Sequence, residues 1–142
     1  MFINFWYPMA LSKELGDAPF QSDALGQSFV LFRDHEGNPH CLANTCIHRG
    51  GSLGAGKLKD GCIECPYHGW QYNGDGQCVH IPTLRANTKI PSRARVDTYP
   101  VVERYGLVFA FLGDLPEEER PPILDLKEWD KDGWSVTGLV YD

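Results

Sequence analysis

Two Cys/His pairs constrain this chain more than any other feature of its sequence. One residue lies between Cys46 and His48, sixteen residues follow, and two residues lie between Cys65 and His68. Each pair comes after a short strand-like segment, so two similar loops would each supply one sulfur and one nitrogen. Thiolate and imidazole ligands in this combination are typical of a metal centre. The fold must therefore bring the two loops together.

Three kinds of site use such residues. Structural zinc usually takes pairs spaced by two to five residues, and the single-residue gap between Cys46 and His48 is unusual for it. A catalytic thiol needs one Cys and a distant base, which would leave the second pair unexplained. A 2Fe-2S cluster with two Cys on one iron and two His on the other uses both pairs. Nearby glycines would let backbone amides approach its sulfides; they are Gly50, Gly51, Gly54, Gly56 and Gly69.

Composition and charge indicate one globular unit. The 142 residues, 42% of them hydrophobic, suffice for one core and are too few for two ordinary domains. The net charge of -6 comes from residues 114–142, which hold nine Asp/Glu against three Lys/Arg. This acidic balance argues against nucleic acid or an anionic membrane as a partner, and no apolar run approaches the roughly 20 residues of a membrane span. Five cysteines without a secretion signal favour a reducing compartment, by default the cytoplasm.

Short strand-like segments separated by turn signals run through most of the chain. Two pairs of segments flank the turns HEGNP and NGDGQ, which predicts two β-hairpins. Further along, Tyr99-Pro100 and Tyr105-Gly106 break residues 94–114 into three short strands. The strands predicted before this region cover residues 28–34, 40–43, 63–65, 70–72 and 78–81.

Helix and loop signals are few. Only LSKEL near Ser12 and LKEWDKD near Trp129 are expected to form helical turns. Residues 83–95 are predicted to form a loop. After Asp114 the strand pattern weakens, as in a linker.

The residues around the Cys/His pairs carry a resemblance to a known family. The stretch Cys46-Ile-His48-Arg49-Gly50, continued by Cys65-Pro66-Tyr67-His68-Gly69-Trp70 and NGDGQCVHIP, resembles the Rieske domain of Rieske non-haem iron oxygenases. That family includes the α subunits of aromatic ring-hydroxylating dioxygenases and related O-demethylases. NFWYPMALSKEL resembles its entry segment and YPVVERYGLVFAFLGD its closing strands, so the similarity covers residues 4–114.

The resemblance implies a fold, a cofactor and its ligands. The fold would be all-β, a Rieske-type antiparallel β-sandwich with a small cluster-binding subdomain of two loops. Residues 1–114 would form the Rieske [2Fe-2S] domain, and residues 115–142 the linker and the start of a missing catalytic domain. The sulfur ligands would bind the inner iron of the cluster and the imidazoles the outer iron. The implied cofactor-binding and metal-ligating residues are Cys46, His48, Cys65 and His68.

Two functions are compatible with such a domain. In an oxygenase it would relay electrons from a reductase or ferredoxin to a mononuclear Fe(II) in the catalytic domain, and the full-length protein would be a homotrimer. The family's Asp-x2-His-x4-His run for that iron is absent from the sequence, so no catalytic residue is assigned and we expect a part of a longer oxygenase. Alternatively, the chain is a free-standing Rieske-type ferredoxin, an electron carrier. The entry segment and the tail favour the oxygenase, since a carrier needs neither.

Respiratory Rieske proteins, which the ligand region also resembles, indicate how the cluster would be tuned. Those proteins have a disulfide between the loops at positions that correspond to Gly51 and Tyr67, and a serine donor at the position of Trp70. Without these features the reduction potential is expected at the low end of the Rieske range, about -150 mV rather than about +300 mV. Tyr72 stands where those proteins have a tyrosine donor, and would either bond a ligand sulfur or merely pack.

Several other residues have competing interpretations. Cys41, Cys62 and Cys78 are interpreted as small buried residues. Tyr67 and Trp70 would shield the cluster or pack in the core. Arg49 would pair with a carboxylate or remain a surface arginine. His35, His40 and His80 are interpreted as surface or hydrogen-bonded side chains. Four cations lie between Thr83 and Val96. They would form either part of a docking or subunit contact or only a solvated loop; they are Arg85, Lys89, Arg93 and Arg95.

Overall fold

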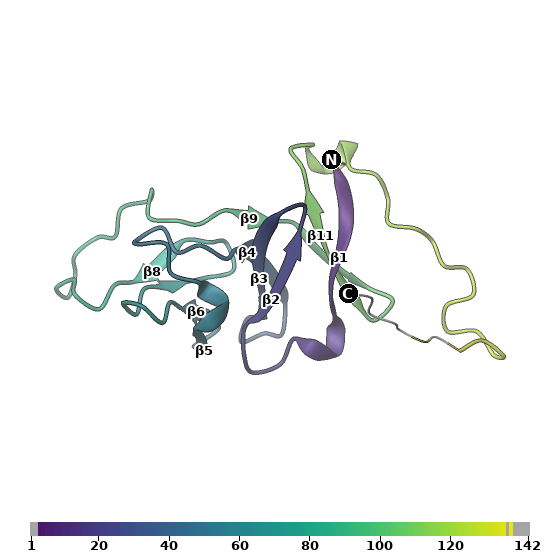
Figure 1. Ribbon diagram of the computed structural model, residues 1–142, viewed down its shortest axis with the longest axis horizontal. Coiled ribbons are helices and arrows are strands. Elements are labelled where there is room, and N and C mark those ends of the chain that lie inside the picture. The colour runs from purple at the N-terminus through teal and green to yellow at the C-terminus, as the bar shows by residue number, and fades with distance from the viewer. Residues whose placement is uncertain (1–2, 136, 138–142) are drawn as a thin grey trace.

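The computed structural model describes residues 3–135 and 137, and these adopt an all-β fold, as predicted (Figure 1). All strand pairs are antiparallel. The strands are β1 (Phe5–Leu11), β2 (Phe20–Ala24), β3 (Gln27–Arg33), β4 (Pro39–Ala43), β5 (Lys57–Lys59), β6 (Cys62–Glu64), β7 (Gln71–Tyr72), β8 (Cys78–His80), β9 (Thr98–Tyr99), β10 (Val101–Arg104) and β11 (Leu107–Leu112). Three short 3₁₀ helices accompany them: η1 (Ser12–Glu14), η2 (Leu53–Ala55) and η3 (Glu117–Glu119).

Two of the three sheets form a sandwich. Their strand orders are β1-β11-β10 and β2-β3-β4-β9. The register of β1 against β11 shifts between Pro8 and Ala10, and β1 is an edge strand, where proline and irregular pairing are tolerated. Side chains from both sheets pack into one core, which includes Met9, Phe29, Leu31, Cys41 and Val108. This packing confirms the predicted β-sandwich.

Strand β3 is buried on both faces and joins the sandwich to the ligand loops. Phe29 and Leu31 face the sandwich core, whereas Val30 and Phe32 belong to a second core that contains Cys46 and other residues beneath the loops. Because successive side chains of a strand point to opposite faces, a strand buried on both sides has a continuous apolar run. The four residues from Phe29 to Phe32 are such a run, and none is more than 1% exposed.

The third sheet, β5-β6-β7-β8, forms a small lobe (residues 45–97) together with the ligand loops. The loop between β4 and β5 holds the first Cys/His pair, and the loop between β6 and β7 holds the second. The lobe extends from one end of the sandwich (Figure 1). The chain after β8 returns along it, and Ile81, Ile90 and Ala94 pack into the core beneath the loops. The expected two-loop subdomain is therefore built on a four-stranded sheet.

Most local predictions are confirmed, and the exceptions have physical reasons. The predicted strands correspond to β3, β4 and β6 to β11, and residues 83–95 contain no regular strand. Near Ser12 only the single 3₁₀ turn η1 forms, closed by the Leu11 N–H, which donates to the Glu14 carboxylate at 2.8 Å. Near Trp129 the predicted helical turns do not become a regular helix: residues 127–130 form a turn, in which the Trp129 N–H donates to the Leu126 carbonyl at 3.0 Å. All four are exposed, and a short helix without a buried face is not stable in water.

The segment after β11 is held against the three-stranded sheet. The Trp6 indole N–H donates to the Pro121 carbonyl at 2.8 Å. Asp125 accepts from the Arg104 guanidinium at 2.9 Å and from the Tyr105 hydroxyl at 3.1 Å, and Trp129 packs against the Tyr105 ring. Apart from η3, residues 115–135 are thus irregular, and these contacts anchor them to the sheet. No helix in the described part of the chain is long and apolar enough to cross a membrane.

Candidate metal centre

The two ligand loops share one backbone construction. In each loop the cysteine N–H donates to the carbonyl five residues later, at 2.9 Å for Cys46 and 2.8 Å for Cys65. The cysteine carbonyl accepts from the N–H of the glycine four residues later, at 2.8 Å from Gly50 and 3.0 Å from Gly69. Both glycines have φ near +70°, a conformation that glycine adopts without steric cost. The sequence predicted equivalent pairs, and the backbone makes the two loops equivalent.

The two thiols lie inside the small lobe. Cys46 and Cys65 are each 2% exposed and belong to the same core as Leu53 and Ile63. Burial raises the pKa of the Cys65 thiol, the backbone N–H groups of the second loop oppose this by hydrogen bonding to the sulfur, and the nearby Cys46 adds to the increase. Two buried thiols ionise together only where a cation neutralises them. Metal coordination meets that requirement.

The two imidazoles lie at the surface of the same lobe. His48 and His68 are exposed, and their ring centroids are 4.7 Å apart at an interplanar angle of 67°. Reduced hydration and the neighbouring His68 and Arg49 lower the pKa of His48, which favours the neutral ring that binds metals. The loops therefore place two sulfur donors together inside and two nitrogen donors together outside.

This pairing of donors fits a [2Fe-2S] cluster. Among residues 3–135 and 137, no three His, Cys, Asp or Glu side chains are grouped as ligands of a single metal ion. A Rieske cluster needs only two protein ligands at each iron, two thiolates at one and two imidazoles at the other. The residues present match both the number and the chemistry of that set.

Each imidazole is covered by an aromatic ring from the second loop. Trp70 lies parallel to His48, with ring centroids 4.5 Å apart and an interplanar angle of 7°. Tyr67 lies on His68 with centroids 4.0 Å apart and an angle of 33°. Tyr67 is 60% exposed, so it is not a core residue, and shielding is the interpretation that the geometry favours. One feature of the sequence indicated that Tyr67 and Trp70 could shield the imidazoles: both aromatic residues lie within two positions of His68.

Tyr72 resolves an alternative that the sequence left open. Its side chain is fully buried, and its hydroxyl lies 3.1 Å from the Cys46 Sγ. Burial and the contact with Cys46 raise the pKa of Tyr72, so the hydroxyl keeps its proton. Tyr72 can therefore donate a hydrogen bond to the sulfur once that sulfur is a thiolate.

Positions 51 and 67 face each other between the loops. A Cβ added to Gly51 would lie 3.3 Å from the Tyr67 Cβ and 3.1 Å from the Cys65 Sγ. Disulfides join Cβ atoms about 3.5–4.5 Å apart, and positions 51 and 67 are slightly closer than this, so they are direct neighbours across the two loops. All five cysteines of this chain are free. The close contact with Cys65 also explains why this position holds a glycine.

Of the three thiols outside the predicted ligand set, two are buried as predicted and one is not. Cys41 and Cys78 are buried, at 1% and 2% exposure, as predicted. Burial raises the pKa of Cys41 to about 12, so this thiol stays protonated. Cys62 is only partly buried, and its interpretation as a buried residue is wrong because it lies on the face of β6 opposite to the fully buried Ile63.

The other histidines and Arg49 do not belong to the metal centre. His40 Nε2 lies 2.9 Å from the Asp34 carboxylate, which confirms it as a hydrogen-bonded side chain. His35 and His80 are exposed. Arg49 is exposed and forms no ion pair with a carboxylate of the described residues, as expected of a surface arginine.

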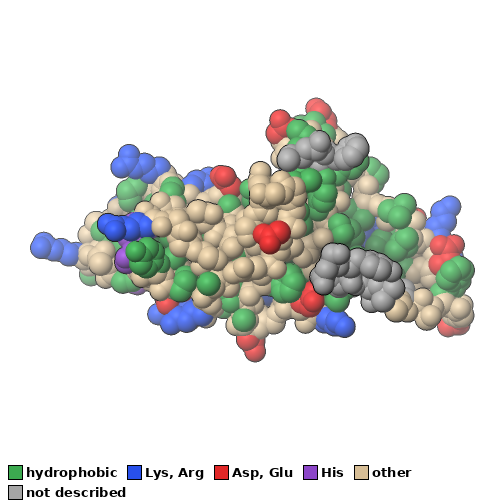
Figure 2. All heavy atoms as spheres, viewed as in Figure 1, with side chains coloured by type: hydrophobic (Ala, Val, Ile, Leu, Met, Phe, Trp, Pro, Cys, Tyr) green, Lys and Arg blue, Asp and Glu red, His purple; other side chains and the backbone are tan. Residues whose placement is uncertain are grey.

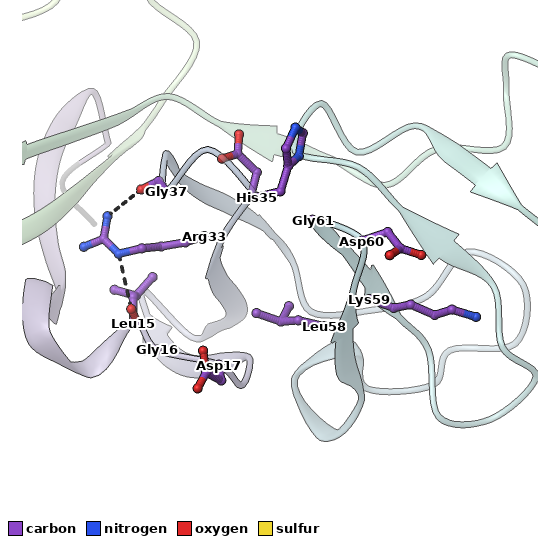
Figure 3. Close-up of a pocket in the computed structure, with 11 residues that line it drawn as sticks. Leu15, Gly16, Asp17, Arg33, His35, Gly37, Leu58, Lys59, Asp60 and Gly61 are labelled. Atoms are coloured by element: carbon purple, nitrogen blue, oxygen red, sulfur yellow. Dashed lines mark hydrogen bonds between the residues drawn. The ribbon is translucent and has the colours of Figure 1, made fainter.

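A surface pocket of about 500 Å³ lies apart from the ligand loops, between the β3–β4 turn and the β5–β6 turn. Figure 3 shows Arg33 on one side, where it donates to the Leu15 and Gly37 carbonyls, and Lys59 and Asp60 on the other. None of the four predicted ligands lines the pocket. It is not part of the metal centre.

Comparisons with known proteins agree with this geometry. Residues 5–100 match the family described as Rieske [2Fe-2S] domain. The chain is 42% identical over 127 residues to the phenoxybenzoate dioxygenase subunit alpha of Ectopseudomonas oleovorans, covering 88% of this chain and 31% of that protein. It is 39% identical to a chloroplastic chlorophyllide a oxygenase of Chlamydomonas reinhardtii, covering 83% of this chain and 18% of that protein.

A solved structure shows the same fold. The crystal structure of apo dicamba monooxygenase superposes with a TM-score of 0.75 at 36% identity, over 84% of this chain and 37% of that chain. The present chain thus spans less than two fifths of the proteins it matches here. With the family match covering most of its length, the chain belongs to the Rieske [2Fe-2S] domain family.

Proposed function

We propose that this chain is the electron-entry domain of an oxygenase and that Cys46, Cys65, His48 and His68 hold its cluster. The thiolates would bind the inner iron and the imidazoles the outer iron. The observation that carries this proposal is the pairwise placement of two buried thiols and two exposed imidazoles on loops of equivalent construction. A bound cluster of this type would supply a one-electron carrier.

Each part of the site has a task in such a carrier. The core beneath the loops excludes water from the sulfur side, because Cys46 and Cys65 are almost fully buried. Tyr72 and the backbone N–H groups of the second loop donate hydrogen bonds toward the sulfurs. The exposed imidazoles of His48 and His68 provide the route by which electrons enter and leave, because they link the metal side of the site to the surface.

Similarity to oxygenases supports the wider proposal. A reductase or ferredoxin would supply electrons, and a mononuclear iron in a catalytic domain would receive them; one similar structure is titled dicamba monooxygenase with non-heme iron and dicamba. The Rieske domain would comprise residues 1–114, whose last strand β11 pairs with the first strand β1. We further propose a homotrimer for the longer protein and a reducing compartment such as the cytoplasm, which the five free cysteines support.

Anaerobic reconstitution with iron and sulfide, followed by EPR spectroscopy of the reduced protein, tests the ligand set. We expect the low average g value of a mixed Cys/His cluster. The variants Cys46→Ser and Cys65→Ser should lose the cluster, whereas Cys62→Ser, at a thiol outside the ligand set, should keep it. An all-Cys type of signal, or stoichiometric zinc in place of iron, would contradict the proposal.

Activity measurements separate the oxygenase from a free-standing carrier. The 142-residue chain should accept and donate electrons, yet hydroxylate no substrate when supplied with reductase, Fe(II) and dioxygen. The longer protein should do both. Turnover by the short chain would contradict the assignment to an electron-entry domain, and an uninterrupted gene that ends after this sequence would favour the carrier.

A further inference from the structure

Apart from the thiols and Tyr72, only two polar side chains are buried among residues 3–135 and 137. They are Asn44, which is 7% exposed, and Gln71, which is 8% exposed. Charged side chains lie at or near the surface, as Figure 2 shows for one face of the molecule, because water solvates them there. A buried amide instead needs hydrogen-bond partners to offset its lost hydration. Both amides find these partners at the ends of the ligand loops.

Asn44 joins the two ends of the first ligand loop (residues 46–51). It lies two positions before the loop, and its Oδ1 accepts from the Gly54 N–H at 2.6 Å and from the Ser52 hydroxyl at 3.2 Å. Its Nδ2 donates to the Ser28 hydroxyl on β3 at 3.1 Å. We call Asn44, Ser52 and Gly54 the first clamp. It ties the chain that enters the loop to the chain that leaves it, and ties both to the sandwich.

The second ligand loop (residues 65–70) is closed in the same way. Glu64 directly precedes this loop and Gln71 directly follows it. The Gln71 Nε2 donates to the Glu64 carboxylate at 2.7 Å, and the two residues are partners in the pairing of β6 with β7. Lys57 lies 3.1 Å from the other carboxylate oxygen. We call Glu64 and Gln71 the second clamp. Each ligand loop thus has one buried amide that joins its entry to its exit.

The clamps act through direction, which an apolar side chain could not supply. An apolar residue of similar volume could fill the same space without the cost of burying an amide. A fully bonded buried polar group instead fixes the orientation of the segments that it joins. This orientation matters because Trp70, the last residue of the second loop, stacks on His48 of the first loop at an angle of 7°. A shift of either loop end would change this contact between the loops.

We infer that Asn44 and Gln71 are positioning residues, each of which holds its own ligand loop closed. By fixing the loop ends, the two clamps keep the buried thiols and the exposed imidazoles in the arrangement that a [2Fe-2S] cluster requires. The ligand roles in this inference rest on the proposed function. Residues that support metal ligands contribute roughly 10–100-fold to metal affinity, so the clamps should slow the release of the cluster.

Hydrogen exchange by mass spectrometry, on peptides that cover each loop of the cluster-loaded chain, tests whether each clamp acts on its own loop. The test variants are Asn44→Leu and Gln71→Met, which keep the approximate side-chain volume and remove the hydrogen bonds. We expect Asn44→Leu to speed exchange in the first loop at least ~10-fold and to leave the second loop within about threefold of the parent. Gln71→Met should do the reverse.

The matched control is Val96→Ala. Val96 is 4% exposed in the core beneath the loops, and its truncation lowers stability while the hydrogen bonds of both clamps stay in place. This variant should have a lower Tm without faster exchange in one particular loop. In the presence of an iron chelator, the visible absorbance of the cluster should disappear at least ~10-fold faster in the two clamp variants than in this control.

Two results would overturn the inference: equal acceleration of both loops by one clamp variant, or cluster release no faster than in Val96→Ala. If Asn44→Leu does not fold, Ser52→Ala removes one hydrogen bond of the first clamp and should show the same loop-specific pattern. A parent chain without the EPR signal of a mixed Cys/His cluster would refute the proposed function instead. Exchange of the two loops in the chain as purified would then still decide the role of the clamps.

Discussion

Replacing Tyr72 by phenylalanine removes one hydroxyl from the sulfur side of the site and leaves the ring in place. The Tyr72 hydroxyl lies 3.1 Å from Cys46 Sγ in a fully buried position. When the sulfur is a thiolate ligand, only the hydroxyl can donate in this contact. Reduction adds one negative charge to the cluster and its sulfurs, so the hydrogen bond is stronger in the reduced state. Its loss should therefore lower the reduction potential.

The size of the shift follows from the energy of such a bond. A hydrogen bond to a charged group contributes roughly 1.5–3 kcal/mol. The bond exists in both oxidation states, and only the difference between them affects the potential; if half of its energy depends on the added charge, the difference is roughly 0.7–1.5 kcal/mol. For a one-electron couple a factor of ten, about 1.4 kcal/mol, corresponds to 59 mV. We expect the potential of Tyr72→Phe to fall by about 30–60 mV.

Protein-film voltammetry at pH 7 measures this shift. Tyr67→Phe is the control, because it removes a hydroxyl from an exposed ring that covers His68, and its potential should stay within about 10 mV of the parent. The EPR signal of Tyr72→Phe should keep its type, which shows that the ligands are unchanged. A potential that rises, or that does not differ from the Tyr67→Phe control, would refute the argument that this hydroxyl stabilises the reduced cluster.

Three further changes test the packing, the charges and the aromatic cover. Leu53→Ala removes a fully buried side chain beneath the ligand loops and should cost about 2–5 kcal/mol of stability, seen as a lower Tm by circular dichroism, while Leu124→Ala at a 74% exposed position should change it little. Because His40 lowers the pKa of Asp34, their pairing contributes stability that is present above about pH 4 and lost as the pH falls further. Asp34→Asn should therefore lower Tm at pH 7, and the difference from the parent should begin to shrink as the pH falls below about 4. Trp70→Ala uncovers His48 and admits water, which stabilises the more negative reduced state, so voltammetry should show a higher potential.

The sequence was most informative where the signals are local. The ligand loops, the strands β3 and β4, and the breaks after Tyr99 and Tyr105 depend on residues close together in the chain. The continuous apolar run of β3 indicated a strand, but not that its two faces serve different cores. That property depends on which sheets pack on each face, and neither periodicity nor propensity encodes it.

The strands β1, β2 and β5 were missed because their own sequences carry weak strand signals. β1 contains Pro8 and pairs with β11 about a hundred residues later. β2 has the polar sequence FQSDA, and β5 is only the three residues KLK. Each becomes a strand because a neighbouring strand supplies hydrogen bonds and packing, which outweigh weak intrinsic preference. Only β1 has a distant partner. β2 and β5 pair with β3 and β6 across two-residue turns, and the turn Asp60-Gly61 is itself a hairpin signal that could have indicated β5.

The same distinction applies to the metal centre. The identities of the four predicted ligands follow from type and spacing, so the sequence could name them. The parallel stacking of Trp70 on His48 and the contact of the Tyr72 hydroxyl with Cys46 depend on how two loops meet in space. For Tyr72 the sequence was compatible with a hydrogen bond to a ligand sulfur or with packing alone. The distance between its hydroxyl and Cys46 Sγ favours the hydrogen bond.

The placement of the ligand loops has a consequence for how a catalytic domain would receive electrons. The small lobe with β5, β6 and β8 lies at one end of the long axis, while the segment after β11 extends at the other end (Figure 1). The contacts of Pro121 with Trp6 and of Asp125 with Arg104 hold that segment against the three-stranded sheet, which is not the lobe that carries the ligand loops. We therefore expect electrons to pass from His48 and His68 to the iron of a neighbouring subunit. Mixed oligomers of the longer protein test this: subunits with Cys46→Ser, combined with subunits that lack the mononuclear iron, should recover activity only if transfer crosses between subunits.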